Sequence, residues 1–428
     1  MQIQLEEKIK NKTAQIAVIG LGYVGLPLAV ELAKTGFLVT GIDTDADRVH
    51  NVKNAIPYIL DVDSNDIKRL VERKSLVATI DFRRLAHMDV IIICVPTPLK
   101  RKYQPNINYI KQAVTQIRAY LRKGQLVILE STTYPGTTDE VILPMLESTG
   151  LQCGKDFFLV FSPERIDPGN EKFPLNKIPK VVGGVTPESS YLFKLLYEHI
   201  IERVVVVSSP RAAETVKLLE NTFRLINIGL VNELAMMCHK MGMDVWEIID
   251  AAKTKPFGFM PFYPGPGVGG HCIPKDPLYL YWKAKLHGFK SRFIKLASDL
   301  NSAMPSYVVE RLNALKPLKE AKVLVLGATY KKDVKDLRKS PSLEILGLLR
   351  KFKAEVFYAD PLIPYLKFDH FNLKATPLTE DALSGMDSVV LVTDHSAFDY
   401  DFILKHSRII FDTRNVYKGV KNEKIIRL

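Results

Sequence analysis

Cys272 is the residue of this chain whose type and setting most clearly suggest chemistry. It lies in the segment 261–277, where nine of 17 residues are Gly or Pro, so the segment is predicted to be a loop. A core-filling cysteine is not expected there, and Cys272 is therefore a candidate nucleophile, with an unreactive surface thiol as the alternative. The other cysteines fit strand or helix patterns and are predicted to be inert packing residues: Cys94, Cys153 and Cys238.

The neighbours of Cys272 favour the same interpretation. Gly269 and Gly270 have no side chains, which is expected to let a substrate approach closely. Lys275 and Asp276 follow shortly after and place a cation and a carboxylate near the sulfur.

A second polar group lies in the segment 212–241, which has no proline and one glycine and is predicted to be a long helix. Lys217, Asn221 and Arg224 are spaced so that they project from one face. Polar residues on an otherwise apolar helix are costly unless they face a polar site, and a solvated face is the alternative. The apolar residues cover more than one stripe, which predicts a spine between two domains and an oligomer contact rather than an ordinary core helix.

Other candidates follow the ends of predicted strands. Glu164 is a candidate acid or base, and Arg165 is a candidate ligand for phosphate or sugar. Thr97 and Thr132 also follow strands, and ligands of a doubly wound sheet bind beyond the carboxyl ends of its strands. We therefore expect both threonines to touch a cofactor. The alternative is that they belong to ordinary Ser/Thr turns without a functional role.

Gly20, Gly22 and Gly25 form a Gly-X-Gly-X-X-Gly pattern that follows an apolar strand and opens a helix. Glycines permit the tight turn and let the backbone approach a pyrophosphate at the helix N-terminus. Asp43 ends the next strand and is expected to bond a ribose 2′-hydroxyl, which favours NAD over NADP, while Arg48 weakens that preference. A flavin site or a degenerate fold is the alternative.

Alternating strands and helices must position these residues. This alternation predicts a parallel sheet covered by helices on both faces. The predicted strands of the first series are Gln15–Ile19, Phe37–Ile42, Asp89–Val95, Gln125–Leu129, Phe157–Phe161, Lys180–Val182 and Val204–Val207, with a helix over Val24–Thr35.

A second series begins at 322–327, and its next strand, 355–359, ends at Asp360. This order repeats that of the first series. The second copy lacks the full glycine pattern, so it is not expected to bind a dinucleotide.

Composition excludes several classes of protein. The 428 residues are 47% hydrophobic and 25% charged, which excludes a disordered chain. Four scattered cysteines without a Cys-X-X-Cys pair predict neither a disulfide framework nor a metal site. The net charge is +12, but the sequence has no nucleic-acid-binding motif, so no nucleic-acid partner is expected. The binding of phosphate groups is a sufficient reason for part of the positive charge. No signal peptide or membrane-length apolar run is present, so a cytoplasmic protein without membrane insertion is predicted.

Together these motifs resemble the UDP-glucose/GDP-mannose dehydrogenase family over nearly the whole chain. Two of its segments, SPERIDPGN and KPFGFMPFYPGPGVGGHCIP, look most like those of the UDP-N-acetylglucosamine 6-dehydrogenases of surface-polysaccharide synthesis. The segments that carry the resemblance are GLGYVGLP, VPTP at 95–98, ESTT at 130–133, SPER at 162–165, Lys217/Asn221, PGPGVGGHC at 264–272 and Lys331/Arg338.

The resemblance implies an α/β fold with two Rossmann-like doubly wound domains joined by a long central helix. Residues 1–208 would bind NAD, residues 209–313 would form a central helical dimerisation domain with the cysteine loop, and residues 314–428 would bind the UDP-sugar. A homodimer or higher homo-oligomer is expected.

The resemblance also implies a role for individual residues. Those expected at the cofactor are Gly20, Gly22, Tyr23, Val24, Gly25, Asp43, Arg48, Thr97, Thr132, Lys275 and Arg338. Those expected at the substrate are Glu164, Arg165, Ile166, Lys217, Asn221, Arg224, Phe262, Tyr263, Gly265, Gly269, Tyr330 and Lys331. Those expected in catalysis are Cys272, Lys217, Asn221, Glu164, Asp276 and Thr132.

The chemistry implied is a four-electron oxidation of a sugar C6 alcohol to a uronate through a thiohemiacetal and a thioester on Cys272. Lys217 and Asn221 can stabilise the oxyanions, Glu164 or Asp276 can act as the base for water, and Thr132 can hold that water. N-acetylglucosamine is the expected sugar, with N-acetylgalactosamine, N-acetylmannosamine and glucose as alternatives. A two-electron hydroxyacid dehydrogenase and a non-catalytic binding protein are the alternatives of other classes.

Overall fold

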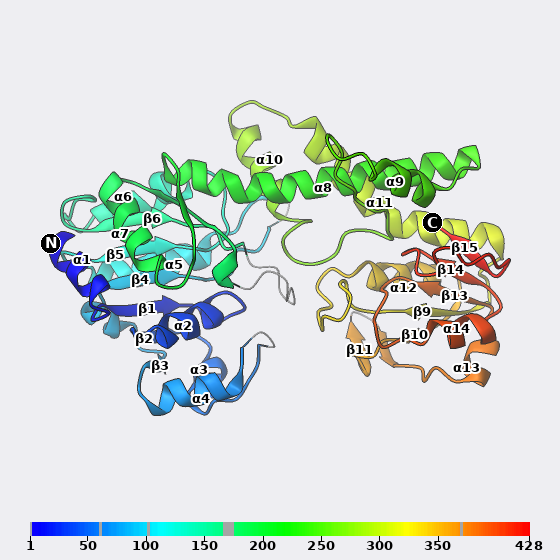
Figure 1. The fold of residues 1–428 in the computed structure, drawn as a ribbon, viewed down its shortest axis with the longest axis horizontal. Helices are drawn as coiled ribbons and strands as arrows, with labels where there is room; N and C mark the ends of the chain where they lie inside the picture. The colour runs from blue at the N-terminus through cyan, green and yellow to red at the C-terminus, as the bar shows by residue number, and fades with distance from the viewer. Residues whose placement is uncertain (1, 60–61, 101–102, 166–174, 369–370) are drawn as a thin grey trace. The chain divides into compact units, whose positions relative to one another are not determined.

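The computed structural model describes residues 2–59, 62–100, 103–165, 175–368 and 371–428. The chain divides into two compact units: unit 1 is Met1–Glu220 with Trp282–Gly288, and unit 2 is Asn221–Tyr281 with Phe289–Leu428. Each unit contains a mainly parallel sheet with helices packed on it (Figure 1). The predicted α/β fold with two Rossmann-like sheets is confirmed, and the three domain boundaries stay a prediction.

Unit 1 is built on an eight-stranded sheet with the order β3-β2-β1-β4-β5-β6-β7-β8. The first six positions have the strand order of a dinucleotide-binding fold. Its elements are α1 (Gln2–Lys10), β1 (Gln15–Ile19), α2 (Gly25–Lys34), β2 (Leu38–Ile42), α3 (Ala46–Lys53), α4 (Ser64–Glu72), β3 (Leu76–Thr79), η1 (Phe82–His87), β4 (Val90–Ile93), α5 (Asn108–Tyr120), β5 (Leu126–Leu129), η3 (Thr137–Ile142), α6 (Leu143–Glu147), β6 (Phe158–Phe161), η4 (Leu175–Lys177), β7 (Lys180–Gly184), α7 (Pro187–Tyr197) and β8 (Val204–Val206).

The central strands of unit 1 are buried on both faces. Every residue of β4, β5 and β6 is buried, as expected for parallel strands covered by helices on both sides. Alternate residues such as Val90 and Ile92 pack into one core with α2 and α7. The residues between them, such as Ile91 and Ile93, are fully buried on the opposite face.

The predicted strands are found within two residues of their expected ends, with one error in direction. A parallel sheet was predicted, but β7 runs antiparallel to β6 and parallel to β8, so the sheet is mixed. The strand β3 was not among the predicted strands, and it pairs with β2 at the edge of the sheet.

The predicted long helix is α8 (Pro210–Met241), which has 32 residues and runs from unit 1 into unit 2. The loop predicted for 261–277 ends earlier, because Asp276 is the first residue of α10. The remaining elements are α9 (Val245–Ala252), α10 (Asp276–Leu286), α11 (Arg292–Leu315), β9 (Lys322–Leu326), α12 (Pro341–Lys351), β10 (Glu355–Ala359), β11 (Tyr365–Phe368), β12 (Phe371–Lys374), α13 (Glu380–Ser384), β13 (Ser388–Leu391), α14 (Tyr400–His406), β14 (Ile410–Asp412) and β15 (Ile425–Arg427).

Unit 2 is built on a parallel sheet with the order β10-β9-β13-β14-β15. Val323 and Val325 of β9 pack in a core with α11 and α12, while Leu324 and Leu326 pack in a second core with α13 and α14. A separate hairpin joins β11 and β12. The second βα series is therefore a complete doubly wound fold, as the repeat in the sequence indicates.

Candidate active site

The glycine pattern of unit 1 forms a tight turn beside the end of β4. Gly20 has φ +95°, and its backbone lies against Cys94 so closely that a Cβ would be 2.7 Å from the Cys94 carbonyl oxygen. A Cβ on Gly25 would lie 1.8 Å from the Gly20 carbonyl oxygen. Gly22 differs, since its Cβ would meet nothing closer than Arg48 at 3.8 Å. The turn is therefore closed on the sheet side and open at Gly22, as a pyrophosphate cradle requires.

Asp43 fixes the loop that follows β1. Its carboxylate accepts hydrogen bonds from Leu21 N at 2.7 Å and Asp45 N at 2.9 Å, and Arg48 lies at 3.3 Å. Asp43 is buried, and it directly follows β2 at the edge where the glycine turn lies. These residues fit the adenosine half of a dinucleotide, because an acidic residue at this place accepts a hydrogen bond from the ribose hydroxyl.

We predict that Gly25→Ala destabilises unit 1 even without cofactor, because the added Cβ collides with the backbone at Gly20. The expected cost is about 1–3 kcal/mol, with loss of NAD binding. Thermal denaturation of the protein without NAD measures the first effect, and Gly22→Ala is the matched control, whose Cβ enters open space. Equal losses of stability in both variants would contradict the close-packed turn.

The two predicted threonines lie together at the carboxyl ends of β4 and β5. Thr97 Oγ1 donates to the Thr132 carbonyl oxygen at 2.6 Å, so the two loops support each other. Tyr23 is 56% exposed in the glycine turn, and Val24 precedes the first residue of α2. The predicted cofactor residues of unit 1 thus gather at one edge of the sheet.

Glu164 belongs to a buried charge cluster that the sequence did not reveal. Lys180 Nζ lies 2.8 Å from Glu164 Oε2 and 3.1 Å from Glu130 Oε2, and Tyr197 donates its hydroxyl to Glu130. The remaining Glu164 oxygen accepts from Arg165 N at 2.7 Å. Burial raises the pKa of Glu130. For Lys180, burial is the largest single effect and lowers its pKa, but the two carboxylates Glu130 and Glu164 together outweigh it, so the pKa of Lys180 is raised. The cluster holds the Glu164 carboxylate at a fixed place, with a partner on each oxygen.

Arg165 and Lys217 are bound to groups of unit 1. Arg165 makes a two-pronged ion pair with Glu220, with distances of 2.6 and 3.3 Å, and donates to Pro179 O. Lys217 Nζ donates to the backbone carbonyl oxygen of Glu164, so the lysine and the strand end that carries Glu164 are adjacent. The predicted substrate residue Ile166 lies outside the described residues.

Cys272 is exposed, as predicted. Burial lowers the pKa of Lys275 to about 8, and the nearby cations Lys339 and Arg338 lower it further, whereas Asp276 and Cys272 favour its charged form. Burial and Lys275 lower the pKa of His271 to about 4, so this ring is neutral at pH 7. The Cys272 thiol therefore lies beside a cation that can stabilise its thiolate.

Asp276 connects the cysteine loop with α8. The Asp276 backbone N–H donates to Cys272 O at 2.8 Å, and the Asn221 side-chain amide donates to Asp276 Oδ2 at 2.7 Å. Asn221 lies one turn after Lys217 on α8. Two of the predicted catalytic side chains, Asn221 and Asp276, are thus in direct contact close to Cys272.

The structure gives a packing reason for the glycine pair, and the predicted approach of a substrate there stays a prediction. A Cβ on Gly269 would lie 2.5 Å from Tyr330 Cβ, and one on Gly270 would lie 2.8 Å from the Tyr330 ring. The glycines therefore allow close packing of the protein's own Tyr330. Gly270 N also donates to Arg338 O at 2.9 Å. The loop that carries Cys272 is docked on the segment that carries Tyr330, Lys331 and Arg338.

The start of the cysteine loop is also anchored within unit 2. Gly265 N donates to Asn232 Oδ1 at 2.9 Å, and a Cβ on Gly265 would lie 2.7 Å from Arg414. Burial lowers the pKa of Arg414, whose Nε donates to Val392 O. Of the other predicted substrate residues, Phe262 meets Phe223 edge-on, Tyr263 stacks on Trp246, and Arg224 is exposed.

The other cysteines have the surroundings of packing residues. Burial raises the pKa of Cys94 well above its usual range and that of Cys153 to about 11. Cys238 is buried in α8. The predicted pattern is wrong for Cys153, which forms an isolated bridge with Phe157 outside the named strands.

Within the parts of the chain that the structure describes, no group of three or more His, Cys, Asp or Glu side chains could hold a metal ion. None of the helices in these parts is long and apolar enough to cross a membrane.

Sequence profiles of one family match most of the chain in three consecutive pieces. Its NAD binding domain matches residues 14–201, its central domain matches residues 211–303, and its UDP binding domain matches residues 324–419. The chain belongs to the UDP-glucose/GDP-mannose dehydrogenase family. It is an oxidoreductase with NAD as its cofactor, and it acts on a UDP-sugar.

Individual relatives agree on the family and differ in the sugar. The chain is 38% identical to a UDP-N-acetyl-D-glucosamine 6-dehydrogenase of Pseudomonas aeruginosa over 90% of this chain and 92% of that protein. It is 35% identical to an NDP-N-acetyl-D-galactosaminuronic acid dehydrogenase of Ralstonia solanacearum over 97% and 99%. The solved UDP-D-ManNAc dehydrogenase of Pyrococcus horikoshii superposes with a TM-score of 0.87 at 33% identity, covering 96% of this chain and 98% of that one.

Sequence reasoning missed several residues of the site. Lys180, the cation between Glu130 and Glu164, begins an apolar strand, where a lysine usually indicates a solvated end. His271 and Arg414 become noticeable only when the loops are docked. The one available signal was position, because Arg414 follows β14 and so lies at the carboxyl edge of the second sheet.

Proposed function

We propose that this enzyme oxidises the C6 alcohol of UDP-N-acetylglucosamine to the uronic acid, using two molecules of NAD for each sugar. The observation that carries the proposal is the exposed Cys272 thiol beside the desolvated Lys275, in a loop docked on the second nucleotide-type fold. A thiolate is the common side chain that can both trap an aldehyde at neutral pH and leave as a thioester. We propose that the enzyme makes this product in the cytoplasm, as a precursor of surface polysaccharide.

The proposed reaction has four steps that balance in electrons. Bound NAD supplies the hydride acceptor for each oxidation. The C6 alcohol loses a hydride and a proton to give an aldehyde, and the Cys272 sulfur adds to it as a thiohemiacetal. Loss of a second hydride and proton leaves a thioester. Water then breaks the carbon–sulfur bond, which releases the carboxylate and regenerates the thiol.

The residues of the chain supply the charges that these steps need. Lys217 is the proposed cation for the oxyanions, and the second amide hydrogen of Asn221 can join it while the first remains on Asp276. Asp276 is buried, in contact with Asn221, and adjacent to the Cys272 backbone, so it is the proposed base for water. Glu164, fixed by Lys180, is proposed to position the substrate, and Thr132 to hold the attacking water.

We propose N-acetylglucosamine as the sugar because the segments 162–170 and 255–274 resemble those of the N-acetylglucosamine enzymes. The relatives named for N-acetylmannosamine and N-acetylgalactosaminuronic acid keep those two sugars as competitors. They differ from the proposed substrate by the configuration at one carbon.

The test counts NADH released for each UDP-sugar consumed. We expect two NADH for each UDP-N-acetylglucosamine and a kcat/KM higher than that for the galacto, manno and gluco analogues. One NADH would support a two-electron dehydrogenase, and none would contradict the enzyme assignment. A different preferred sugar with two NADH would overturn the sugar alone.

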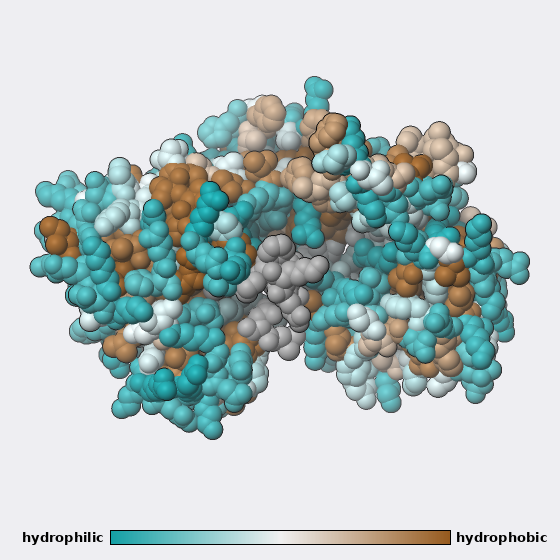
Figure 2. All heavy atoms as spheres, viewed as in Figure 1, coloured by the Kyte–Doolittle hydropathy of each residue, from teal (hydrophilic) through white to brown (hydrophobic). Residues whose placement is uncertain are grey.

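We also propose a homodimer formed through α8. Leu219, Phe223, Leu230 and Met237 recur along one side of this helix and are 48–60% exposed. Their spacing places them within a narrow stripe, which monomeric proteins rarely leave in water. The visible face of each unit is otherwise mainly hydrophilic, with smaller hydrophobic areas between the charged residues (Figure 2).

A further inference from the structure

The second fold of this chain repeats the acidic residue of the first. Asp43 directly follows β2 and accepts from Leu21 N, and Asp360 directly follows β10 and accepts from Ala328 N at 2.6 Å. Gly20 and Gly327 occupy equivalent turns, with φ values of +95° and +84°. The two folds therefore share the local geometry that in unit 1 belongs to the cofactor site.

The two carboxylates differ in what else they bind. Asp360 also accepts from Thr329 N, Leu362 N and Ile363 N, and its Oδ2 lies 3.1 Å from His395 Nε2. Burial opposes its charge, but the hydrogen bonds from His395 and these backbone groups lower the pKa of Asp360. Asp360 thus has four backbone donors and His395, which fill the roughly four lone-pair sites of a carboxylate, whereas Asp43 has two backbone donors and Arg48. Asp360 therefore has no capacity left to accept from a ribose hydroxyl.

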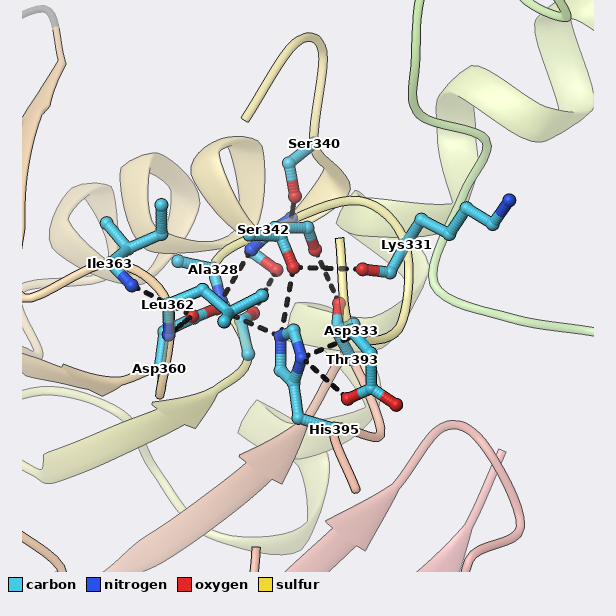
Figure 3. Close-up of polar contacts among 12 residues, drawn as sticks. Ala328, Lys331, Asp333, Ser340, Ser342, Asp360, Leu362, Ile363, Thr393 and His395 are labelled. Atoms are coloured by element: carbon cyan, nitrogen blue, oxygen red, sulfur yellow. Dashed lines mark hydrogen bonds and ion pairs between the residues drawn. The ribbon is translucent and has the colours of Figure 1, made fainter. Parts of the chain in front are cut away.

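His395 is completely buried between Asp360 and the loop that follows β9. The Asp333 backbone N–H donates to its Nδ1 at 3.1 Å, which places the ring proton on Nε2. That Nε2 lies 2.9 Å from Thr329 Oγ1, and the Thr329 hydroxyl donates to Lys331 O. Figure 3 shows the ring with Asp360 on one side and Asp333 on the other. The histidine thus links Asp360 at the sheet edge to Thr329 and Asp333, which precede and follow Lys331 in the loop.

The loop held by His395 is the loop on which the cysteine segment docks. It carries Tyr330, which packs against Gly269 and Gly270. It ends at Arg338, whose carbonyl oxygen accepts from Gly270 N. A continuous set of contacts therefore leads from Asp360 through His395 to the backbone two residues before Cys272.

We propose that His395 is a positioning residue, whose Nδ1 contact with Asp333 holds the 328–339 loop in place to bind the UDP part of the substrate and to support the Cys272 loop. The proposal rests on the proposed function, because it takes Lys331 and Tyr330 as substrate residues. His395 touches neither substrate nor cofactor in this role. Asp360 holds the His395 ring in place and, in this proposal, does not bind a ribose.

Two substitutions separate the halves of the ring. His395→Asn keeps an acceptor near the Nδ1 position and loses the donor to Asp360, whereas His395→Gln keeps a donor near Nε2 and loses the acceptor for Asp333 N. His395→Gln removes the acceptor of Asp333 N, whereas His395→Asn removes the donor that Asp360 and Thr329 share. A merely structural histidine would therefore give His395→Asn an effect at least as large as that of His395→Gln. His406→Gln, on α14 of the same unit, is the matched control.

We expect His395→Gln to raise the KM for the UDP-sugar and the Kd for free UDP, measured by calorimetry, about tenfold. His395→Asn is expected to stay within about threefold of the wild type. Both should lower the melting temperature, His395→Asn at least as much as His395→Gln, and leave the Kd for NAD unchanged. Equal changes of KM in the two variants, or none in His395→Gln, would overturn the proposal.

Hydrogen exchange gives a readout that needs no substrate. The Asp333 amide should exchange faster in His395→Gln than in His395→Asn and the wild type, and unchanged exchange would overturn the clamp itself. If wild-type protein oxidises no UDP-sugar while the Asp333 amide responds as expected, the proposed function fails and the clamp remains.

Discussion

Replacement of Cys272 by serine is expected to lower uronate formation by roughly 10³-fold or more, the scale of loss seen when a covalent nucleophile is removed. A serine hydroxyl is a far weaker nucleophile at neutral pH and a poorer leaving group than a thiolate, so the oxidation should stall after the first NADH. Binding of NAD should survive, because the glycine turn and Asp43 lie in unit 1. Product analysis with NADH counting and NAD titration measures both effects.

Cys153→Ser is the matched control for that experiment. Its thiol is half-buried in unit 1, and burial raises its pKa to about 11, so it should behave as a packing residue with near-normal turnover. Full uronate production by the Cys272→Ser variant would reject the covalent mechanism and favour a two-electron hydroxyacid dehydrogenase. Loss of NAD binding in that variant would instead show that the substitution acts on the fold.

The fold could be predicted from the sequence where local signals and burial agree. Strands β1 and β10 have the predicted ends and β9 ends one residue before the predicted segment does, because each is a short apolar run followed by Gly or Asp. The glycine pattern could be placed in its turn for the same reason. The reversed direction of β7 could not be predicted, since strand sequences carry no sign of orientation beyond the length of the connection.

Part of the site depends on loop docking, which no local pattern encodes. Gly269 and Gly270 have the composition of an open substrate loop, yet Tyr330, some sixty positions further along, fills the space beside them. His395 has an isolated position between a strand and a polar turn, and only the sheet topology brings it to Asp360. The residue types were informative, but their partners are set by long-range packing.

Replacement of Lys180 by methionine is expected to destabilise unit 1 by about 3–5 kcal/mol, because it leaves the Glu130 and Glu164 carboxylates buried without their shared cation. The change keeps the length and apolar character of the side-chain stem. Turnover should fall as well, because Glu164 then loses the contact that fixes its charge and orientation.

The size of that loss should depend on pH in a definite direction. Burial already raises the pKa of Glu130 in the wild type, and the loss of the Lys180 charge is expected to raise the folded-state pKa values of both Glu130 and Glu164. Carboxyls with raised pKa values favour the folded state when protonated, so the variant should approach wild-type stability at low pH and lose stability as the pH rises through the raised values. Denaturation of the variant and the wild type at pH 5 and pH 8 measures this difference.

Lys123→Met supplies the contrast that gives the Lys180 result its meaning. Lys123 also pairs with a carboxylate of unit 1, Asp156, at 3.0 Å, but its side chain is 63% exposed. Only Asp156 is buried in that pair, and it keeps the hydrogen bond from the Gln152 backbone N–H when the lysine is replaced, so a smaller loss of about 1 kcal/mol is expected. A loss for Lys180→Met that is as small, or that is independent of pH, would mean that Glu130 and Glu164 do not depend on Lys180 for their charge. The proposed positioning role of Glu164, which depends on Lys180, would then be rejected.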